Sequence, residues 1–113
     1  MDEDCGVEAI GSVLEDAVAR SILVQTTREP MSASTLAEQC GVSEATIYRR
    51  LETLRASDLI TETTIPDRDG HHYKVYRSNL HRLTVDLTED GFDLTIERKE
   101  TAADRLTKLI EEL

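Results

Sequence analysis

Apolar residues in the first quarter of the chain recur at three- and four-residue steps, which is the period of an amphipathic helix. The positions that define this stripe are Val7, Ile10, Leu14, Val18 and Ile22. They predict one long helix from Val7 to about Thr27, which ends before Pro30 because proline cannot continue a helix.

Two shorter helices are predicted next, separated by a glycine turn. Ser32 or Ser34 can cap the first of them, since a serine hydroxyl accepts a hydrogen bond from a first-turn N–H group. Gly41 stands where the chain needs a left-handed backbone. Ser43 can cap the second helix, which we expect to run to about Ala56.

After Leu59 the apolar period changes from about 3.6 to two, which indicates β-strands. Residues 59–65 and 72–78 are β-rich, and they bracket a turn that contains Pro66 and the pair Asp69-Gly70. This pattern predicts a hairpin with a protruding tip.

A second hairpin and a last helix complete the predicted elements. Apolar and polar residues alternate around the turn at 88–91, which predicts a hairpin with one buried face, formed by Leu83, Val85, Leu87, Phe92, Leu94 and Ile96. The chain closes with an amphipathic helix from about Thr101, with one apolar face formed by Ala102, Leu106, Leu109, Ile110 and Leu113.

Two short helices joined by a glycine turn and followed by a hairpin make a winged helix-turn-helix. We therefore expect an α+β fold: a winged helix-turn-helix with an additional C-terminal β-hairpin and a terminal dimerisation helix. The expected organisation is a flexible acidic tail at 1–6, a winged helix-turn-helix DNA-binding domain at 7–80, and a dimerisation element at 81–113, formed by the second hairpin and the C-terminal helix.

Charge is distributed unevenly along the chain, whose formal net charge is -10 and whose pI is about 4.6. Residues 1–40 sum to -6, residues 41–82 to +1 and residues 83–113 to -5. One interpretation is a solubilising acidic surface. The other is adaptation to high internal salt, because the basic residues are mostly arginine, with three lysines in the whole sequence.

Short signatures of enzymes are missing from the sequence, which has no Cys-x-x-Cys, His-Glu-x-x-His, Gly-x-Gly-x-x-Gly or P-loop pattern. We therefore expect no enzyme activity and no cofactor. The segment Met1-Asp2-Glu3-Asp4 is the opposite of a basic signal peptide, and no apolar run is long enough to span a bilayer, so we expect a cytoplasmic protein with no membrane partner.

The second short helix has the residues of a DNA-reading helix. At ~100° per residue, Ile47, Leu51 and Leu54 face the core, and this leaves Thr46 and Arg49 outside. Arg49 can form two hydrogen bonds to guanine, worth about 1–3 kcal/mol of discrimination, and Thr46 can contact a base edge. The predicted DNA-binding residues, including phosphate contacts from the hairpin, are Ser43, Ala45, Thr46, Tyr48, Arg49, Arg50, Thr53, Arg68, His71, His72 and Lys74.

The stretch PMSASTLAEQCGVSEATIYRRLETLRASDLI resembles the helix-turn-helix core of ArsR-like winged-helix regulators, and GHHYKVYRSNLHRLTV resembles small haloarchaeal members of that superfamily. The resemblance covers roughly residues 14–113. It implies a homodimeric transcription regulator that binds double-stranded DNA, with the recognition helix at 43–55 and the wing at 60–77. The Cys-x-Cys motif of the metal-sensing branch is absent, so no metal site is implied and the small-molecule effector is left open.

The first and last predicted helices both have apolar faces that one small core cannot cover. Pairing them across a two-fold axis would place two recognition helices ~34 Å apart, as a pseudo-palindromic operator requires. The predicted dimer-interface residues are Ile10, Leu14, Ala102, Leu106, Leu109, Ile110 and Leu113. Two alternatives remain open: a protein interaction module without DNA binding, and a redox- or metal-responsive regulator that uses Cys5 and Cys40.

Overall fold

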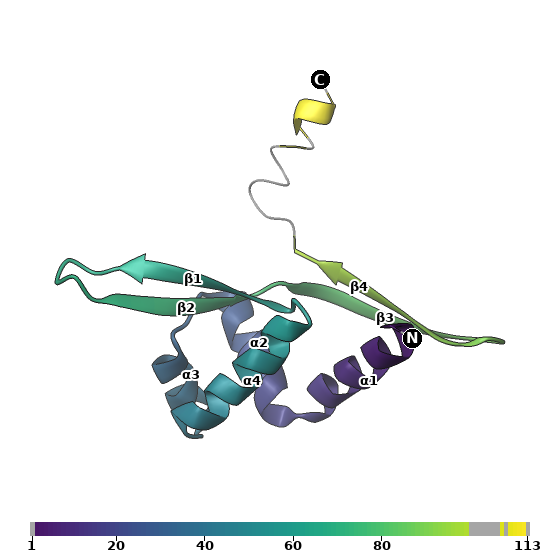
Figure 1. The fold of residues 1–113 in the computed structure, drawn as a ribbon, viewed down its shortest axis with the longest axis horizontal. Helices are drawn as coiled ribbons and strands as arrows, with labels where there is room; N and C mark the ends of the chain where they lie inside the picture. Colours follow the sequence, from purple (N-terminus) through teal and green to yellow (C-terminus); the bar gives the residue numbers. More distant parts are fainter. Residues whose placement is uncertain (1, 100–106, 108, 113) are drawn as a thin grey trace.

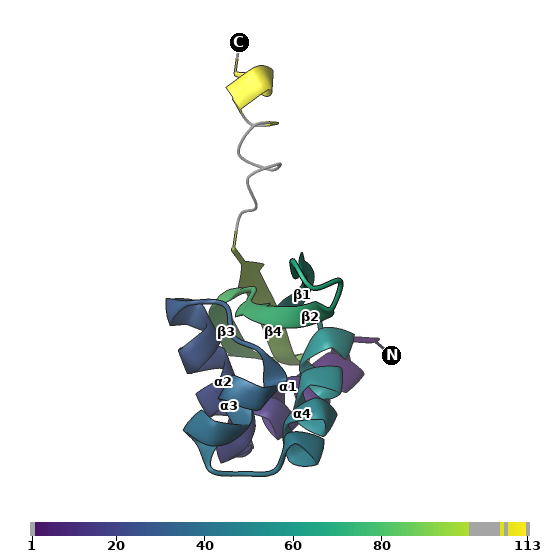
Figure 2. The same ribbon diagram turned by 90° about the vertical axis from the view of Figure 1, so that its left-hand side faces the viewer.

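The computed structural model of the protein describes residues 2–99, 107 and 109–112, with side chains from residue 6 onward. The helices and strands are α1 Asp2–Glu15, α2 Ala17–Arg28, α3 Ala33–Cys40, α4 Glu44–Ala56, β1 Ile60–Pro66, β2 His72–Ser78, β3 Leu80–Thr88 and β4 Gly91–Arg98. The four helices lie together on one side of two hairpins, which extend in opposite directions (Figure 1). The view turned by 90° shows the same two layers (Figure 2). The predicted α+β winged helix-turn-helix with an extra hairpin is confirmed.

The prediction of one long first helix is wrong, because the helix is interrupted at Asp16. This residue has an extended backbone (φ -86°, ψ 112°), and its carboxylate accepts hydrogen bonds from the N–H groups of Val18 at 2.9 Å and Ala19 at 3.3 Å. Asp16 therefore caps a new helix, α2. The helix before it begins at Asp2, so residues 2–6, which we expected to be a flexible tail, belong to α1.

The helix-turn-helix forms through the local signals that the sequence contains. The Ser32 hydroxyl, rather than that of Ser34, caps α3 by accepting a hydrogen bond from the Thr35 N–H group at 3.2 Å. Gly41 ends α3 in the left-handed region, with φ 67°. The Ser43 hydroxyl then caps α4. The predicted cap at Ser43 and the predicted end of α4 at Ala56 are both confirmed.

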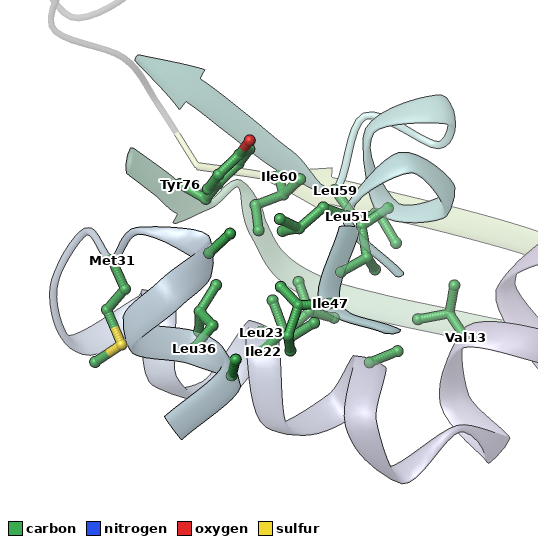
Figure 3. Close-up of a cluster of buried hydrophobic side chains, with 14 of the residues drawn as sticks. Val13, Ile22, Leu23, Met31, Leu36, Ile47, Leu51, Leu59, Ile60 and Tyr76 are labelled. Carbon is green, nitrogen blue, oxygen red and sulfur yellow. The ribbon is translucent and has the colours of Figure 1, made fainter. Parts of the chain in front are cut away.

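The core lies between the helices and the bases of both hairpins. Figure 3 shows Ile60 and Tyr76, from the base of the β1–β2 hairpin, close to Leu51 of α4 and Leu59. The side chains buried most completely are Ile22, Leu36, Ile47, Leu51, Leu54, Leu59, Val13 and Thr26. Three residues of α4 and Leu59, which directly precedes β1, belong to this set, so burial holds α4 against the base of the first hairpin.

The first hairpin pairs β1 with β2 from Ile60 opposite Ser78 to Pro66 opposite His72. A third segment joins it at the base, where Met31 and Tyr76 exchange two backbone hydrogen bonds of 3.0 and 2.8 Å. This bridge fixes β2 to the segment just before α3, and nothing in the apolar pattern predicted it.

The second hairpin pairs β3 with β4 and packs against α1 and the hydrophobic core. Its predicted buried face is only half buried: Leu83, Leu94 and Ile96 are partly covered, whereas Val85, Leu87 and Phe92 are 50, 74 and 55 % exposed. The covered part lies near the base because the helical body does not reach the tip of the hairpin.

The end of the chain is described in part. Residues 109–111 are helical, and the side chains of Leu109 and Ile110 are exposed. Three residues of the predicted dimerisation face, Ala102, Leu106 and Leu113, lie outside the described residues. Within the described part of the chain, no helix combines the length and apolar character that crossing a membrane requires.

Candidate nucleic-acid interface

The orientation predicted for α4 is confirmed by burial. Ile47, Leu51 and Leu54 are at most 2 % exposed. The opposite face therefore points to solvent, where the exposed predicted residues are Ala45, Tyr48, Arg49 and Thr53, beside the partly buried Thr46. Their exposure shows that, among the described residues, no other element covers this face.

Polar groups at the start of α4 form a chain of hydrogen bonds. The Ser43 hydroxyl accepts a bond from the Thr46 N–H group at 3.1 Å and donates one to the Thr46 Oγ1 atom at 3.0 Å. The same Thr46 oxygen accepts a bond from Nη2 of Arg49 at 3.2 Å. The cap, the threonine and the arginine are thus held on one side of the helix, and Arg49 is exposed to solvent with further N–H donors on its guanidinium.

Arg50 has a partner that the sequence did not predict. Its guanidinium forms an ion pair with the Asp16 carboxylate, and its side chain is 33 % exposed. The pair joins α4 to the junction of α1 and α2. We expected Arg50 to contact the DNA backbone, and this stays a prediction. To make that contact, the guanidinium would have to leave Asp16 or be shared with it.

The ionisation of Asp16 reflects these contacts. Burial by itself would raise its pKa, but the backbone N–H groups of Ala19 and Val18 and the Arg50 guanidinium outweigh this effect, so the pKa of Asp16 lies below its usual value. Asp16 thus stays charged while it caps α2 and binds α4.

The predicted wing residues lie on two different parts of the first hairpin. Arg68 and His71 are exposed in the turn between β1 and β2. In the strands, His72 pairs with Pro66 and Lys74 with Thr64, on the same face as the buried Tyr76. His72 and Lys74 therefore point to the side of the hairpin on which α4 lies.

A groove of about 850 Å³ separates α4 from this face of the hairpin. Its lining includes Tyr48, Glu52 and Arg55 from α4 and Glu62, Lys74 and Tyr76 from the hairpin. Glu62 is the centre of its ionic contacts: one carboxylate oxygen lies 3.0 Å from Nη1 of Arg55 and the other 3.4 Å from Nζ of Lys74. Burial, followed by the charge of Glu62, raises the pKa of Tyr76.

Sequence reasoning missed Glu62. The signal that could have found it is the two-residue period, because Glu62 stands two residues after the core residue Ile60 and must share its face. An acidic side chain on the inner face of a strand needs a cationic partner.

The residues predicted for a dimer interface and for redox chemistry have varied surroundings. Ile10 is 3 % exposed and already belongs to the core of its own chain, whereas Leu14 is 44 % exposed. The Cys40 thiol is partly buried and donates a hydrogen bond to the Ser21 hydroxyl at 3.4 Å. The side chain of Cys5 lies outside the described part of the structure.

Comparisons with known proteins agree with this geometry. Residues 14–63 match a family model described as a helix-turn-helix domain. An ArsR-like transcriptional regulator from Rhodococcus sp. RHA1 has a similar structure, with 26% identity and a TM-score of 0.56 over 66% of this chain and 63% of that chain. NolR from Sinorhizobium fredii is also similar, with 25% identity and a TM-score of 0.56 over 68% of this chain and 72% of that chain.

No curated protein sequence matches the chain significantly. The chain spans a little less than two thirds of the length of the Rhodococcus protein. The part of the chain that matches the helix-turn-helix family model, residues 14–63, contains all of α4 and the start of the first hairpin.

Proposed function

We propose that this protein is a DNA-binding transcription regulator of the ArsR-like winged-helix kind, which binds a pseudo-palindromic operator as a homodimer. The observation that carries the proposal is the uncovered face of α4, where Ser43, Thr46 and Arg49 form a chain of hydrogen bonds beside exposed Ala45 and Tyr48. The helix-turn-helix match and the two structurally similar regulators support it.

In this proposal α4 enters the major groove with its first turns against the base edges. Arg49 forms two hydrogen bonds to a guanine, and the Thr46 methyl or hydroxyl group contacts a neighbouring base. Because Thr46 already restrains the Arg49 guanidinium, less side-chain entropy is lost on binding. Ser43, Tyr48 and Thr53 contact the backbone beside the groove, and the wing reaches the next phosphates with Arg68, His71, His72 and Lys74.

The homodimer would form through surfaces away from α4. Leu14, Leu109 and Ile110 are 44, 61 and 60 % exposed, so they are available for contact with a second copy. Pairing them with a second copy would separate the two α4 helices by ~34 Å. We expect Leu109→Glu to give monomers by light scattering, whereas Thr107→Glu, two residues earlier, should leave the dimer intact, because a step of two residues turns a helix by about 200°. An unchanged dimer in Leu109→Glu would remove this helix from the interface.

The acidity of the chain fits this function if the protein works in a high-salt cytoplasm. With about five phosphate contacts, raising salt from 0.2 to 3 M would weaken purely ionic DNA binding on the order of 10⁵-fold. At that salt the Debye length is about 3 Å or less, so repulsion between DNA and the acidic surface is screened while direct Arg49 and Thr46 contacts persist. A KCl series should therefore show a maximum in affinity, and a monotonic decrease from ~0.1 to ~3 M would contradict the salt-adapted function.

The decisive experiment is selection of duplexes from a random pool by the full chain, followed by fluorescence anisotropy with the enriched duplex and a scrambled duplex. Arg49→Gln should reduce the preference for the enriched duplex about tenfold, as expected for the loss of one base-reading arginine. Arg28→Gln is the matched control, because Arg28 is an exposed arginine on α2, away from the α4 face. Failure to enrich any sequence, or equal effects of both variants, would favour the interaction-module alternative.

A further inference from the structure

We infer that Glu62 is a positioning residue for DNA recognition, whose carboxylate holds the wing at a set angle to α4 and keeps Lys74 neutralised until a phosphate competes for it. The inference rests on the proposed function, because it concerns the relation between the recognition helix and the wing. It concerns no residue among those predicted from the sequence except Lys74.

On the face of the wing that carries Tyr76, Glu62 is the last residue toward the tip that is still partly buried. It lies opposite Tyr76 in the β1–β2 register, and its side chain is 18 % exposed. Beyond it the hairpin leaves the body of the protein: every residue from 66 to 74 is exposed (Figure 1). Packing therefore cannot set the direction of the tip, and the last contacts near the body must do so.

The contacts of Glu62 join three elements through one side chain. Arg55, in the last turn of α4, lies 3.0 Å from one carboxylate oxygen, and Lys74, on β2, lies 3.4 Å from the other. Among the ion pairs of the described residues, Glu62–Arg55 is the one that connects the first hairpin to α4. Loss of the carboxylate would thus free the wing from α4 and would leave two cations without a partner.

Glu62 forms two ion pairs, which we call its Arg55 arm and its Lys74 arm, and the two should have separate consequences for DNA binding. The Arg55 arm restricts the angle between wing and helix, so that bases and backbone are contacted in one register, which is the source of specificity. The Lys74 arm offsets a positive charge that would otherwise attract any phosphate, so it lowers sequence-independent affinity and the salt dependence that accompanies it. Because Glu62 is largely shielded from solvent, salt weakens these contacts less than it weakens exposed pairs.

The first test needs no DNA. Hydrogen–deuterium exchange of the full chain, read by mass spectrometry on peptides from 61–77, should be several-fold faster in Glu62→Gln than in the wild type. Glu52→Gln is the matched control: Glu52 lines the same groove and its loss changes the net charge equally, but it forms no ion pair among the described residues. Equal exchange in Glu62→Gln and Glu52→Gln would overturn the positioning role.

The second test uses the duplex enriched by the wild type and its scrambled counterpart. For Glu62→Gln we expect the ratio of specific to non-specific affinity to fall about tenfold. We also expect the slope of log affinity against log salt on the scrambled duplex to steepen by about 0.9, the value for one additional phosphate contact. A general loss of structure would weaken both duplexes and would flatten the slope, so the two outcomes are opposite.

A further variant separates the two arms and remains informative if Glu62→Gln folds poorly. Arg55→Gln should accelerate exchange in the wing and reduce the affinity ratio, yet leave the salt slope unchanged, because Lys74 keeps its carboxylate partner. A slope that steepens in Arg55→Gln as well, or a wing whose exchange is unchanged in both variants, would refute the inference. If the wild type enriches no duplex, the proposed function fails while the exchange experiment still decides the role of Glu62 in holding the wing.

Discussion

The two hairpins have similar lengths but differ in the polarity and charge of their exposed surfaces. In β1–β2 the inward residues Ile60 and Tyr76 are at most 4 % exposed, and the rest of the hairpin is mainly polar, with Lys74 and two histidines toward the tip. In β3–β4 the apolar strip continues to the tip and remains uncovered at Val85, Leu87 and Phe92. Four exposed carboxylates accompany it, those of Asp86, Glu89, Asp90 and Asp93.

The contrast shows that hairpin geometry alone does not select a binding partner. A polar hairpin with cations can contact a phosphate backbone, whereas an acidic hairpin with an apolar strip repels DNA at low salt and is better suited to contact protein. Asp86 lies directly opposite Asp93, an arrangement that costs stability in an isolated sheet. If the second copy of the proposed homodimer contacts this strip as well as Leu14, Leu109 and Ile110, it brings further carboxylates close to those of the first copy, so we expect salt to strengthen the dimer.

The largest effect is expected at the base of the first hairpin. Ile60→Ala removes a side chain that is 3 % exposed, and it should lower the free energy of unfolding by about 2–5 kcal/mol in urea titrations. Leu87→Ala removes a similar volume from a residue that is 74 % exposed, and it should change the stability of the monomer by no more than about 0.5 kcal/mol. Similar losses in both variants would mean that the second hairpin is as well packed as the first.

The strip on the second hairpin provides the next test. Phe92→Asp should weaken self-association about tenfold or more, measured by sedimentation equilibrium, because it introduces a charge into an apolar contact. The wild type should associate more tightly at ~3 M than at ~0.2 M KCl, where carboxylates on facing copies repel each other. Thr64→Asp on the first hairpin is the control. If Thr64→Asp weakens association and Phe92→Asp does not, the assignment of surfaces to partners is reversed.

A smaller effect is expected where the second hairpin is joined to the end of α4. The Arg98 guanidinium donates hydrogen bonds to the carbonyl oxygens of Ser57 at 2.8 Å and Asp58 at 2.9 Å. Arg98→Gln should therefore lower the free energy of unfolding by about 1 kcal/mol. Arg82→Gln should change it little, since Arg82 lies 3.9 Å from its Glu97 partner on the surface. No difference between the two variants would show that the second hairpin does not depend on this anchor.

The smallest effect concerns the helices on which both hairpins rest. Asp16→Asn keeps a cap for α2 but loses the charge that faces Arg50, and we expect a loss of about 0.5 kcal/mol. Because the folded pKa of Asp16 is lowered from the usual 3.8, this contribution is present above that pH and disappears as the pH falls through the folded pKa. Thermal unfolding of both proteins at several pH values should therefore converge in acid. A constant difference at all pH values would exclude the charge as its cause.

Much of the fold was predictable because its signals are local. The α3–α4 turn follows from a cap hydroxyl at Ser32, a left-handed glycine at position 41 and a second cap at Ser43. Both hairpins were predicted close to their observed bounds, since strand alternation and turn residues lie within a few positions of each other. The break at Asp16 was missed because the apolar spacing of Leu14 and Val18 continues across it as in an unbroken helix.

The candidate site also has features that were predictable from local sequence and features that were not. The exposed face of α4 was predictable from the direction of Ile47, Leu51 and Leu54, which needs nothing beyond helical geometry. The partners of Arg50 and Glu62 were not, because each lies on another element and pairs only after the chain has folded.

Residue types and their spacing are thus enough to place α3, α4 and the four strands and to orient α4, since these properties depend on neighbours within a few residues. Which half of the second hairpin is covered depends on how far the helical body extends beneath it. Which charged side chains of the interface are already paired depends on which segments meet in the folded chain. Burial and ion pairing join atoms that are distant in the chain, so they arise from packing between elements and have no counterpart in local sequence.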